Sequence, residues 1–122
     1  MASDAADWRR MRRGEIWTVA SSEDGASAPR FVAIVQDDGF DATGSVTICA
    51  FTTDPAEAPH FRVEVQPTEA NGLEVPARLM VDKITTVRRS RLETRLGRVE
   101  DTDLRRLTEA LVVFLGVAGA RT

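Results

Sequence analysis

The sequence predicts a mainly β domain of the α+β class, in which a small antiparallel barrel precedes one C-terminal amphipathic helix. Five short segments with strand-like patterns follow one another, and no helical pattern separates them. Parallel strands need a long crossover connection, whereas antiparallel strands can be joined by turns. The order of the segments therefore favours an antiparallel sheet that curls on itself. With 122 residues, one domain is expected.

Apolar periodicity and turn residues delimit the predicted strands. The run at 30–36 is almost continuously apolar, which is typical of a buried central strand, and 60–65 alternates between apolar and polar residues. The last segment, 77–87, is interrupted by Asp82 and Lys83. The five predicted strands are 14–20, 30–36, 45–51, 60–65 and 77–87.

Residues 103–116 carry the helical pattern. Asp101 or Thr102 can cap its start and Gly116 can end it. The apolar face is expected to pack on the core rather than to bind a partner. Its members are Leu104, Leu107, Leu111 and Phe114 or Leu115.

Composition narrows the class of protein. The chain is 43% hydrophobic, 29% charged and has a net charge of -3, which argues against non-specific coating of nucleic acid. Two arginine-rich clusters, Arg9–Arg13 and Arg88–Arg98, leave room for a local basic site, although we interpret the second as a solvated face. No run is long and apolar enough for a membrane span or a secretory signal, so a cytoplasmic location is expected.

Few residues suggest metal or cofactor chemistry. The single cysteine, Cys49, falls in an apolar strand, where a buried and inert thiol is expected. The single histidine, His60, fits a strand edge better than a catalyst. No dinucleotide, P-loop or zinc motif is present, and the acidic turn at 37–41 matches no calcium loop. We therefore expect no cofactor and no metal.

Arg30 and Thr52 form the one pair that suggests a site. Arg30 ends a polar loop and opens a buried strand, which would hold a guanidinium at the mouth of that strand. Thr52 ends another predicted core strand. If the two strands are neighbours, a cation and a hydroxyl meet and form an anion site. The simpler interpretation is a solvated arginine and a threonine that suits a strand.

Several short motifs, in this order and spacing, resemble the MazF/PemK family of toxin endoribonucleases. They are "RRGEIW", a "PR" before an apolar strand, a strand that ends in "TT", and "DKITTVRRSRL". The resemblance covers 11–117, which would be the toxin domain, and leaves 1–10 and 118–122 as tails. It implies an SH3-like barrel that acts as a homodimer, cleaves single-stranded RNA without a metal, and is inhibited by an antitoxin. Contact with DNA would occur only through the toxin–antitoxin complex.

The family's functional positions can be placed on this sequence. Its catalytic arginine and threonine match Arg30 and Thr52. Residues expected near the RNA are Ser22, Glu23, Thr53, Asp82 and Lys83. The sequence departs from the family pattern at Phe31, where proline is usual, at the pair Asp37 and Asp38, and at Lys83, where glutamine is usual. The last two departures bear on RNA specificity. Phe31 changes the backbone setting of Arg30.

The mechanism expected from this resemblance uses the ribose 2′-hydroxyl as the nucleophile. Arg30 would stabilise the developing charge and Thr52 would bind the scissile phosphate. The general base stays open between Glu23, a water molecule and, more remotely, His60. Two alternatives also stay open: a toxin of the same fold that poisons a protein such as DNA gyrase, as CcdB-type proteins do, and a degenerate toxin that binds only its antitoxin.

Overall fold

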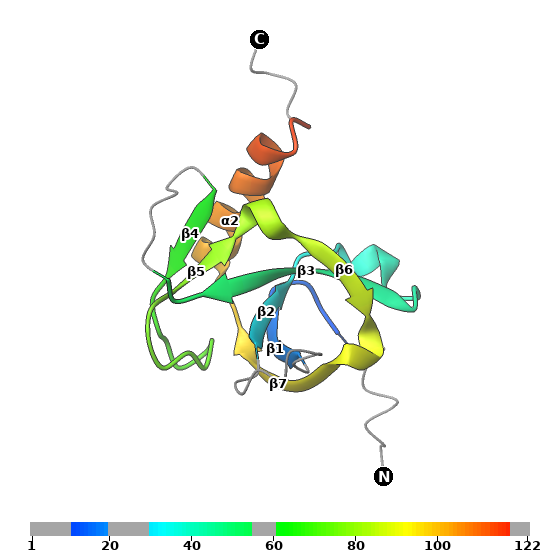
Figure 1. The fold of residues 1–122 in the computed structure, drawn as a ribbon, viewed down its shortest axis with the longest axis horizontal. Coiled ribbons are helices and arrows are strands. Elements are labelled where there is room, and N and C mark those ends of the chain that lie inside the picture. Colours follow the sequence, from blue (N-terminus) through cyan, green and yellow to red (C-terminus); the bar gives the residue numbers. More distant parts are fainter. Residues whose placement is uncertain (1–10, 20–29, 55–60, 118–122) are drawn as a thin grey trace.

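The computed structural model describes residues 11–19, 30–54 and 61–117 (Figure 1). Within these ranges seven strands form one sheet, and a helix follows it. Three single-turn 3-10 helices, Asp38–Phe40, Val81–Lys83 and Arg89–Arg91, lie in the connections. The main elements are β1 (Glu15–Val19), β2 (Arg30–Ile34), β3 (Ser45–Thr52), β4 (Arg62–Val65), β5 (Ala77–Met80), β6 (Thr85–Arg88), β7 (Leu92–Arg98) and α2 (Asp101–Phe114).

The sheet is antiparallel at every pairing among the described strands. Its order is β4-β5-β3-β2-β1-β7, and β6 pairs with β3 beside this path. In Figure 1 the strands β1, β2, β3, β6 and β7 curl around one interior. The curl is completed by the turn at 89–91 rather than by a ladder between β6 and β7 in the described chain. The mainly β, antiparallel class is thereby confirmed, as a curled sheet that is not closed by hydrogen bonds.

Strand β3 packs on two hydrophobic clusters because both of its faces are covered. Val46 and Ile48 belong to the cluster inside the curl, together with Trp17. Cys49 belongs to the second cluster, between the outer face of the sheet and the helix, together with Leu107. The alternation of β3 therefore separates two cores instead of one core from solvent.

The helix α2 covers the outer face of the sheet (Figure 1). Leu107 is fully buried there, and Leu104 and Leu111 are partly buried, which confirms the predicted packing role of these three residues. Phe114 and Leu115, at the end of the helix, are exposed instead. Gly116 has a φ of 73° and ends the helix, as expected. The predicted cap is wrong: Glu100 is the N-cap residue and makes no side-chain cap bond, so Asp101 lies inside the first turn, where its charge favours the helix dipole. No helix in the described ranges is long and apolar enough to cross a membrane.

The predicted strand at 77–87 is two strands. β5 pairs with the end of β3, where Phe51 lies opposite Leu79, and β6 pairs with its start, where Ser45 lies opposite Arg88. The two pairings differ in register by three residues, and these are the three extra residues of the turn at 81–83. Periodicity alone could not reveal this turn, because Val81 within it is buried like a strand residue.

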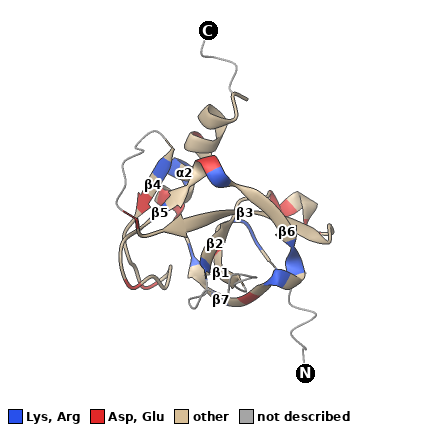
Figure 2. Cartoon of the chain, viewed as in Figure 1, with Lys and Arg blue, Asp and Glu red and all other residues tan. Residues whose placement is uncertain are grey.

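Strand β7 was missed, and the residues around it are more than a solvated face. Figure 2 shows basic residues where β6 passes into β7. One of them, Arg89, is buried, and its Nε donates to the carbonyl oxygen of Thr43 at 2.6 Å. Arg95 pairs with Glu15 at 3.1 Å across β7 and β1. These arginines therefore hold the connection between β6 and β7 and the edge of the sheet in place.

Cys49 is fully buried, as predicted. Burial, together with the nearby carboxylate of Asp82 and partly opposed by Arg62, raises the pKa of its thiol to about 12. Because the thiolate is the reactive species, we expect native protein to resist a thiol reagent at about pH 8 and to react fully once unfolded in guanidinium. Rapid modification of the native protein, followed by absorbance, would contradict this placement.

Candidate functional site

Arg30 and Thr52 lie at the same end of two neighbouring strands. The pairing of β2 with β3 runs from Ile34 opposite Ile48 to Val32 opposite Ala50. The ladder ends there, and Arg30 and Thr52 each lie two residues beyond its last pair, where Thr52 pairs with Arg78 of β5. In an antiparallel pair, residues opposite one another share a face of the sheet. The condition stated for an anion site, that the two strands be neighbours, is met.

Both residues line one cleft of about 610 Å³, a volume within the usual range for ligand sites. One wall comes from the ends of β2 and β3, and the other from the segment that leads into β5 and from β7. The lining residues are Arg30, Phe31, Phe51, Thr52, Thr53, Gly72, Leu73, Glu74, Val75, Ala77 and Leu96. The cleft is thus largely apolar, with a cation and two hydroxyls at one side.

The hydroxyl of Thr52 is oriented by the backbone that follows it. Its Oγ1 accepts a hydrogen bond from the backbone N–H of Asp54 at 3.1 Å. A threonine hydroxyl has one proton to donate and two lone pairs that accept. Since Asp54 occupies an acceptor position, the proton of Thr52 remains able to donate into the cleft.

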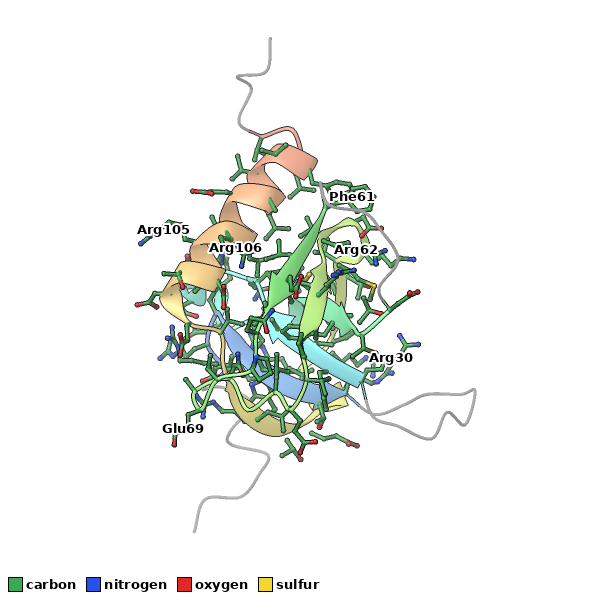
Figure 3. All side chains as sticks on the ribbon, turned by 90° about the vertical axis from the view of Figure 1, so that its left-hand side faces the viewer. Arg30, Phe61, Arg62, Glu69, Arg105 and Arg106 are labelled. Atoms are coloured by element: carbon green, nitrogen blue, oxygen red, sulfur yellow. The ribbon has the colours of Figure 1, made fainter. Side chains whose placement is uncertain are left out.

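Arg30 is exposed at the first position of β2, and Figure 3 shows its side chain projecting from the end of that strand. No carboxylate pairs with its guanidinium among the described residues. Its backbone is held by the central strand of a buried sheet. A fixed strand thus presents a planar cation with several donors, an arrangement suited to the oxygens of a phosphate.

The segment that forms the opposite wall of the cleft is folded on itself through the side chain of Asn71. Its Oδ1 accepts from the backbone N–H groups of Thr68 and Leu73, and its Nδ2 donates to the carbonyl oxygen of Gln66. Asn71 is fully buried, so these three bonds satisfy a polar group that would otherwise be costly. The segment beyond it, from Gly72, is therefore a rigid wall.

Close backbone contact adds to that rigidity. The N–H of Arg98 donates to the carbonyl oxygen of Ala70 at 2.9 Å. A Cβ added at Gly97 would clash with this carbonyl oxygen of Ala70 and would lie 2.8 Å from the carbonyl carbon of Asn71. Glycine is therefore required at 97 for the wall to approach β7 this closely.

A second, smaller cleft of about 210 Å³ adjoins the first across the two threonines. Thr52, Thr53 and Ala77 line both clefts. Glu64 and Arg78 occupy the far side of the second cleft, with 3.8 Å between Oε1 and Nη2. The two clefts therefore lie on either side of the same three residues.

Of the other predicted site residues, the structure places one in the clefts and two outside them. Thr53 lies in both clefts. Asp82 and Lys83 form the turn after β5, outside both clefts, and Asp82 pairs with Arg62 at 3.2 Å. Ser22, Glu23 and His60 lie outside the described residues. The RNA contacts expected for Ser22, Glu23, Thr53, Asp82 and Lys83 all stay predictions.

The acidic turn at 37–41 has structural roles. Asp37 accepts from the backbone N–H of Gly39 at 2.9 Å, Asp38 accepts from the backbone N–H of Arg13 at 2.7 Å, and Asp41 pairs with Arg12. The described part of the chain contains no group of three or more potential metal-ligating side chains.

Sequence reasoning missed most of the wall residues. The segment 66–76 was interpreted as a turn-rich link, and the Asn-Gly pair at 71–72 is the signal that it folds tightly. Its position beside Arg30 depends on contact with β7, far along the chain. Glu74 and Val75 could therefore be assigned to the cleft only from the structure.

The fold and this site can be set beside known proteins. Residues 12–115 match the model of a family described as the PemK-like, MazF-like toxin of type II toxin–antitoxin systems. The chain belongs to this family. The match spans every described strand and the helix, and it includes Arg30 and Thr52.

Two relatives in the family are named as nucleases. A probable endoribonuclease MazF of Mycolicibacterium smegmatis is 51% identical over 109 residues, 89% of this chain and 100% of that protein. Endoribonuclease MazF9 of Mycobacterium tuberculosis is 33% identical, over 86% of this chain and 96% of that protein.

Solved structures share the fold at lower identity. A mycobacterial endoribonuclease in complex with its cognate antitoxin has a TM-score of 0.71 at 21% identity, over 87% of this chain and 95% of that one. A MazE-MazF complex of Deinococcus radiodurans has a TM-score of 0.67 at 20% identity, over 86% and 94%.

Proposed function

We propose that this MazF-like endoribonuclease cleaves single-stranded RNA with the substrate's own 2′-hydroxyl as the nucleophile. The observation that carries the proposal is the shared position of Arg30 and Thr52 at one cleft, a cation beside a hydroxyl with a proton to donate. Attack on phosphorus adds negative charge to the phosphoryl oxygens. Donors fixed in advance where that charge develops lower the barrier.

The two residues have distinct roles in the proposed step. The guanidinium of Arg30 binds the phosphoryl oxygens and stabilises their charge as it grows. Thr52 donates its proton to one of these oxygens, while Asp54 holds the threonine oxygen in place. Both side chains extend from the ends of paired strands, so the backbone that carries them is in place before RNA binds.

The step conserves atoms and charge. The bond from the 2′-oxygen to phosphorus forms, and the bond from phosphorus to the 5′-oxygen breaks. The proton of the 2′-hydroxyl passes to a general base, for which Glu23 and water remain the leading candidates and His60 a remote one. The leaving 5′-oxygen takes a proton from water, so the products are a 2′,3′-cyclic phosphate and a 5′-hydroxyl.

Metal ions are not required in this proposal because Arg30 supplies the positive charge. The test is a mixed-sequence single-stranded RNA incubated with the purified protein in excess EDTA. We expect cleavage at a short recurring motif, at an unchanged rate when EDTA is added. RNA that stays intact with and without added magnesium would contradict the proposed function and favour a toxin that binds a protein target.

Replacement of Thr52 tests the proposed hydroxyl. We expect Thr52→Val, which keeps the shape and removes the donor, to slow RNA cleavage about a hundredfold. Thr52→Ser should recover most of that loss. Thr85→Val is the matched control, since Thr85 is exposed on β6 and lies outside both clefts. Equal single-turnover rates for Thr52→Val and wild type would remove Thr52 from the mechanism.

The partners proposed for the chain follow its family. The family match describes a toxin of a two-component system, and one solved relative is bound to its cognate antitoxin. We extend this to an antitoxin that covers the cleft of this chain and to a homodimer as its working form. We place its activity in the cytoplasm, where its RNA substrates are found.

A further inference from the structure

We propose that Phe31 is the stacking platform for a nucleobase next to the scissile phosphate, and that Glu74 reads the edge of that base. The inference rests on the proposed RNA cleavage and adds the substrate subsite that gives it specificity. Phe31 stands where the family resemblance leads one to expect proline, so the subsite would not be general to the family.

The exposure and position of Phe31 suggest a ligand. It is the second residue of β2 and is 36% exposed, while the next three residues of the strand are buried. It lines the same cleft as Arg30 and Thr52. What distinguishes Phe31 is therefore not its exposure alone but its place in this cleft, where a partly exposed aromatic ring is open to a bound molecule.

The surroundings of Phe31 fit a base better than a phosphate. Apolar side chains supply most of the remaining lining, among them Phe51, Leu73 and Val75. Single-stranded RNA is recognised mainly by stacking its splayed bases on aromatic side chains, with cations along the backbone. An RNA whose phosphate lies at Arg30 and Thr52 therefore has a neighbouring base within reach of this apolar region.

Glu74 gives the subsite its polar edge. It is the one anionic side chain among the described residues that line this cleft, and it is exposed. A carboxylate accepts hydrogen bonds and repels phosphate, so it belongs with the base and not with the backbone. Adenine, cytosine and guanine carry amino groups that can donate to it, whereas uracil offers only its N3–H, flanked by two carbonyl oxygens that a carboxylate repels. We therefore expect an amino-bearing base at this position.

The decisive test is a double-mutant cycle between Phe31 and the RNA. Once the cleavage motif is mapped, an uncleavable oligonucleotide carries a 2′-deoxy sugar at the scissile position and an abasic site at either flanking nucleotide. For wild type, we expect the abasic site at one of these positions to weaken binding about tenfold. For Phe31→Ala, the same abasic site should weaken binding very little relative to the intact oligonucleotide, because the platform for that base is already absent.

Controls separate stacking from general damage. Phe31→Tyr should keep wild-type affinity, while Phe31→Leu, which keeps apolar bulk, should bind like Phe31→Ala. Phe40→Ala is the matched control, since Phe40 is 63% exposed and lies outside both clefts. Thermal unfolding of each variant identifies any loss of fold, and Phe31→Leu keeps the test usable if Phe31→Ala is unstable.

Base identity tests Glu74. Among oligonucleotides that differ only at the coupled nucleotide, wild type should bind an amino-bearing base about fivefold more tightly than uracil. Glu74→Gln should reduce that preference. An unchanged preference would overturn the role of Glu74.

The outcomes distinguish this inference from the proposed function. Cleavage by wild type without coupling between Phe31 and either flanking base overturns the stacking platform and leaves the proposed function standing. Failure of wild type to cleave or bind RNA at all overturns the proposed function, and this inference with it. Coupling at one flanking base, retained by Phe31→Tyr and lost in Phe31→Leu, supports the inference.

Discussion

Replacement of Arg30 by alanine is expected to lower the rate of RNA cleavage by a hundredfold or more. Arg30 is the cation at the cleft that Thr52 shares, and it extends from the end of a buried strand. Loss of one preorganised donor to a developing oxyanion typically costs about 100-fold or more in rate. The measurement is single-turnover cleavage of an RNA that contains the mapped motif, with excess enzyme.

Two further variants make this prediction specific. Arg30→Lys keeps the charge and loses the planar pair of donors, so we expect an intermediate rate. Arg105→Ala is the matched control because Arg105 is exposed on α2, on a different element from the cleft (Figure 3). Arg30 is exposed too, so thermal unfolding of Arg30→Ala should match wild type. Full cleavage by a folded Arg30→Ala would remove the cation from the mechanism.

Replacement of Gly97 by alanine is expected to destabilise the protein by about 3 kcal/mol, at the upper end of the usual cost of overpacking. The new Cβ would meet the backbone of Ala70 and Asn71, and backbone cannot rotate aside as a long side chain can. The free energy of unfolding from urea titration measures the effect. Gly44→Ala is the matched control, since a Cβ there meets nothing within 4 Å.

The same substitution should also lower cleavage in protein that remains folded. If Ala70 and Asn71 move away from β7, the segment from Gly72 to Val75 moves with them, and this segment is the wall opposite Arg30. A wall displaced by about 1 Å can cost about 100-fold in rate. If Gly97→Ala were as stable and as active as Gly44→Ala, the close backbone contact would be unimportant.

Local pattern was sufficient to predict the class of fold and the central strands. The alternation at 45–51 and the apolar run at 30–36 correspond to β3 and β2, because buried faces constrain residue type strongly. Strand β7 lacks that constraint. Among the described strands it pairs with β1 alone, and it exposes most of its side chains, so its sequence is as polar as a loop.

The candidate site was predictable where it depends on strand ends and unpredictable where it depends on distant contacts. Arg30 and Thr52 each stand at a strand end that the sequence marks, and the register of β2 and β3 brings them together. The opposite wall depends on Gly97 and Asn71, which are far apart from Arg30 in the chain. The positions of Phe31 and Glu74 in one cleft follow from that contact and from no local pattern.

The central claim is that the RNA's own 2′-hydroxyl is the nucleophile and that Arg30 and Thr52 supply the stabilising contacts. The most direct measurement compares two oligonucleotides in EDTA that are identical except for a 2′-deoxy sugar at the mapped scissile position, with the ends of the products identified chemically. We predict that the ribose substrate yields a 2′,3′-cyclic phosphate and a 5′-hydroxyl, while the deoxy substrate is bound but not cut. Cleavage of the deoxy substrate, or products with a 5′-phosphate, would contradict the proposed mechanism.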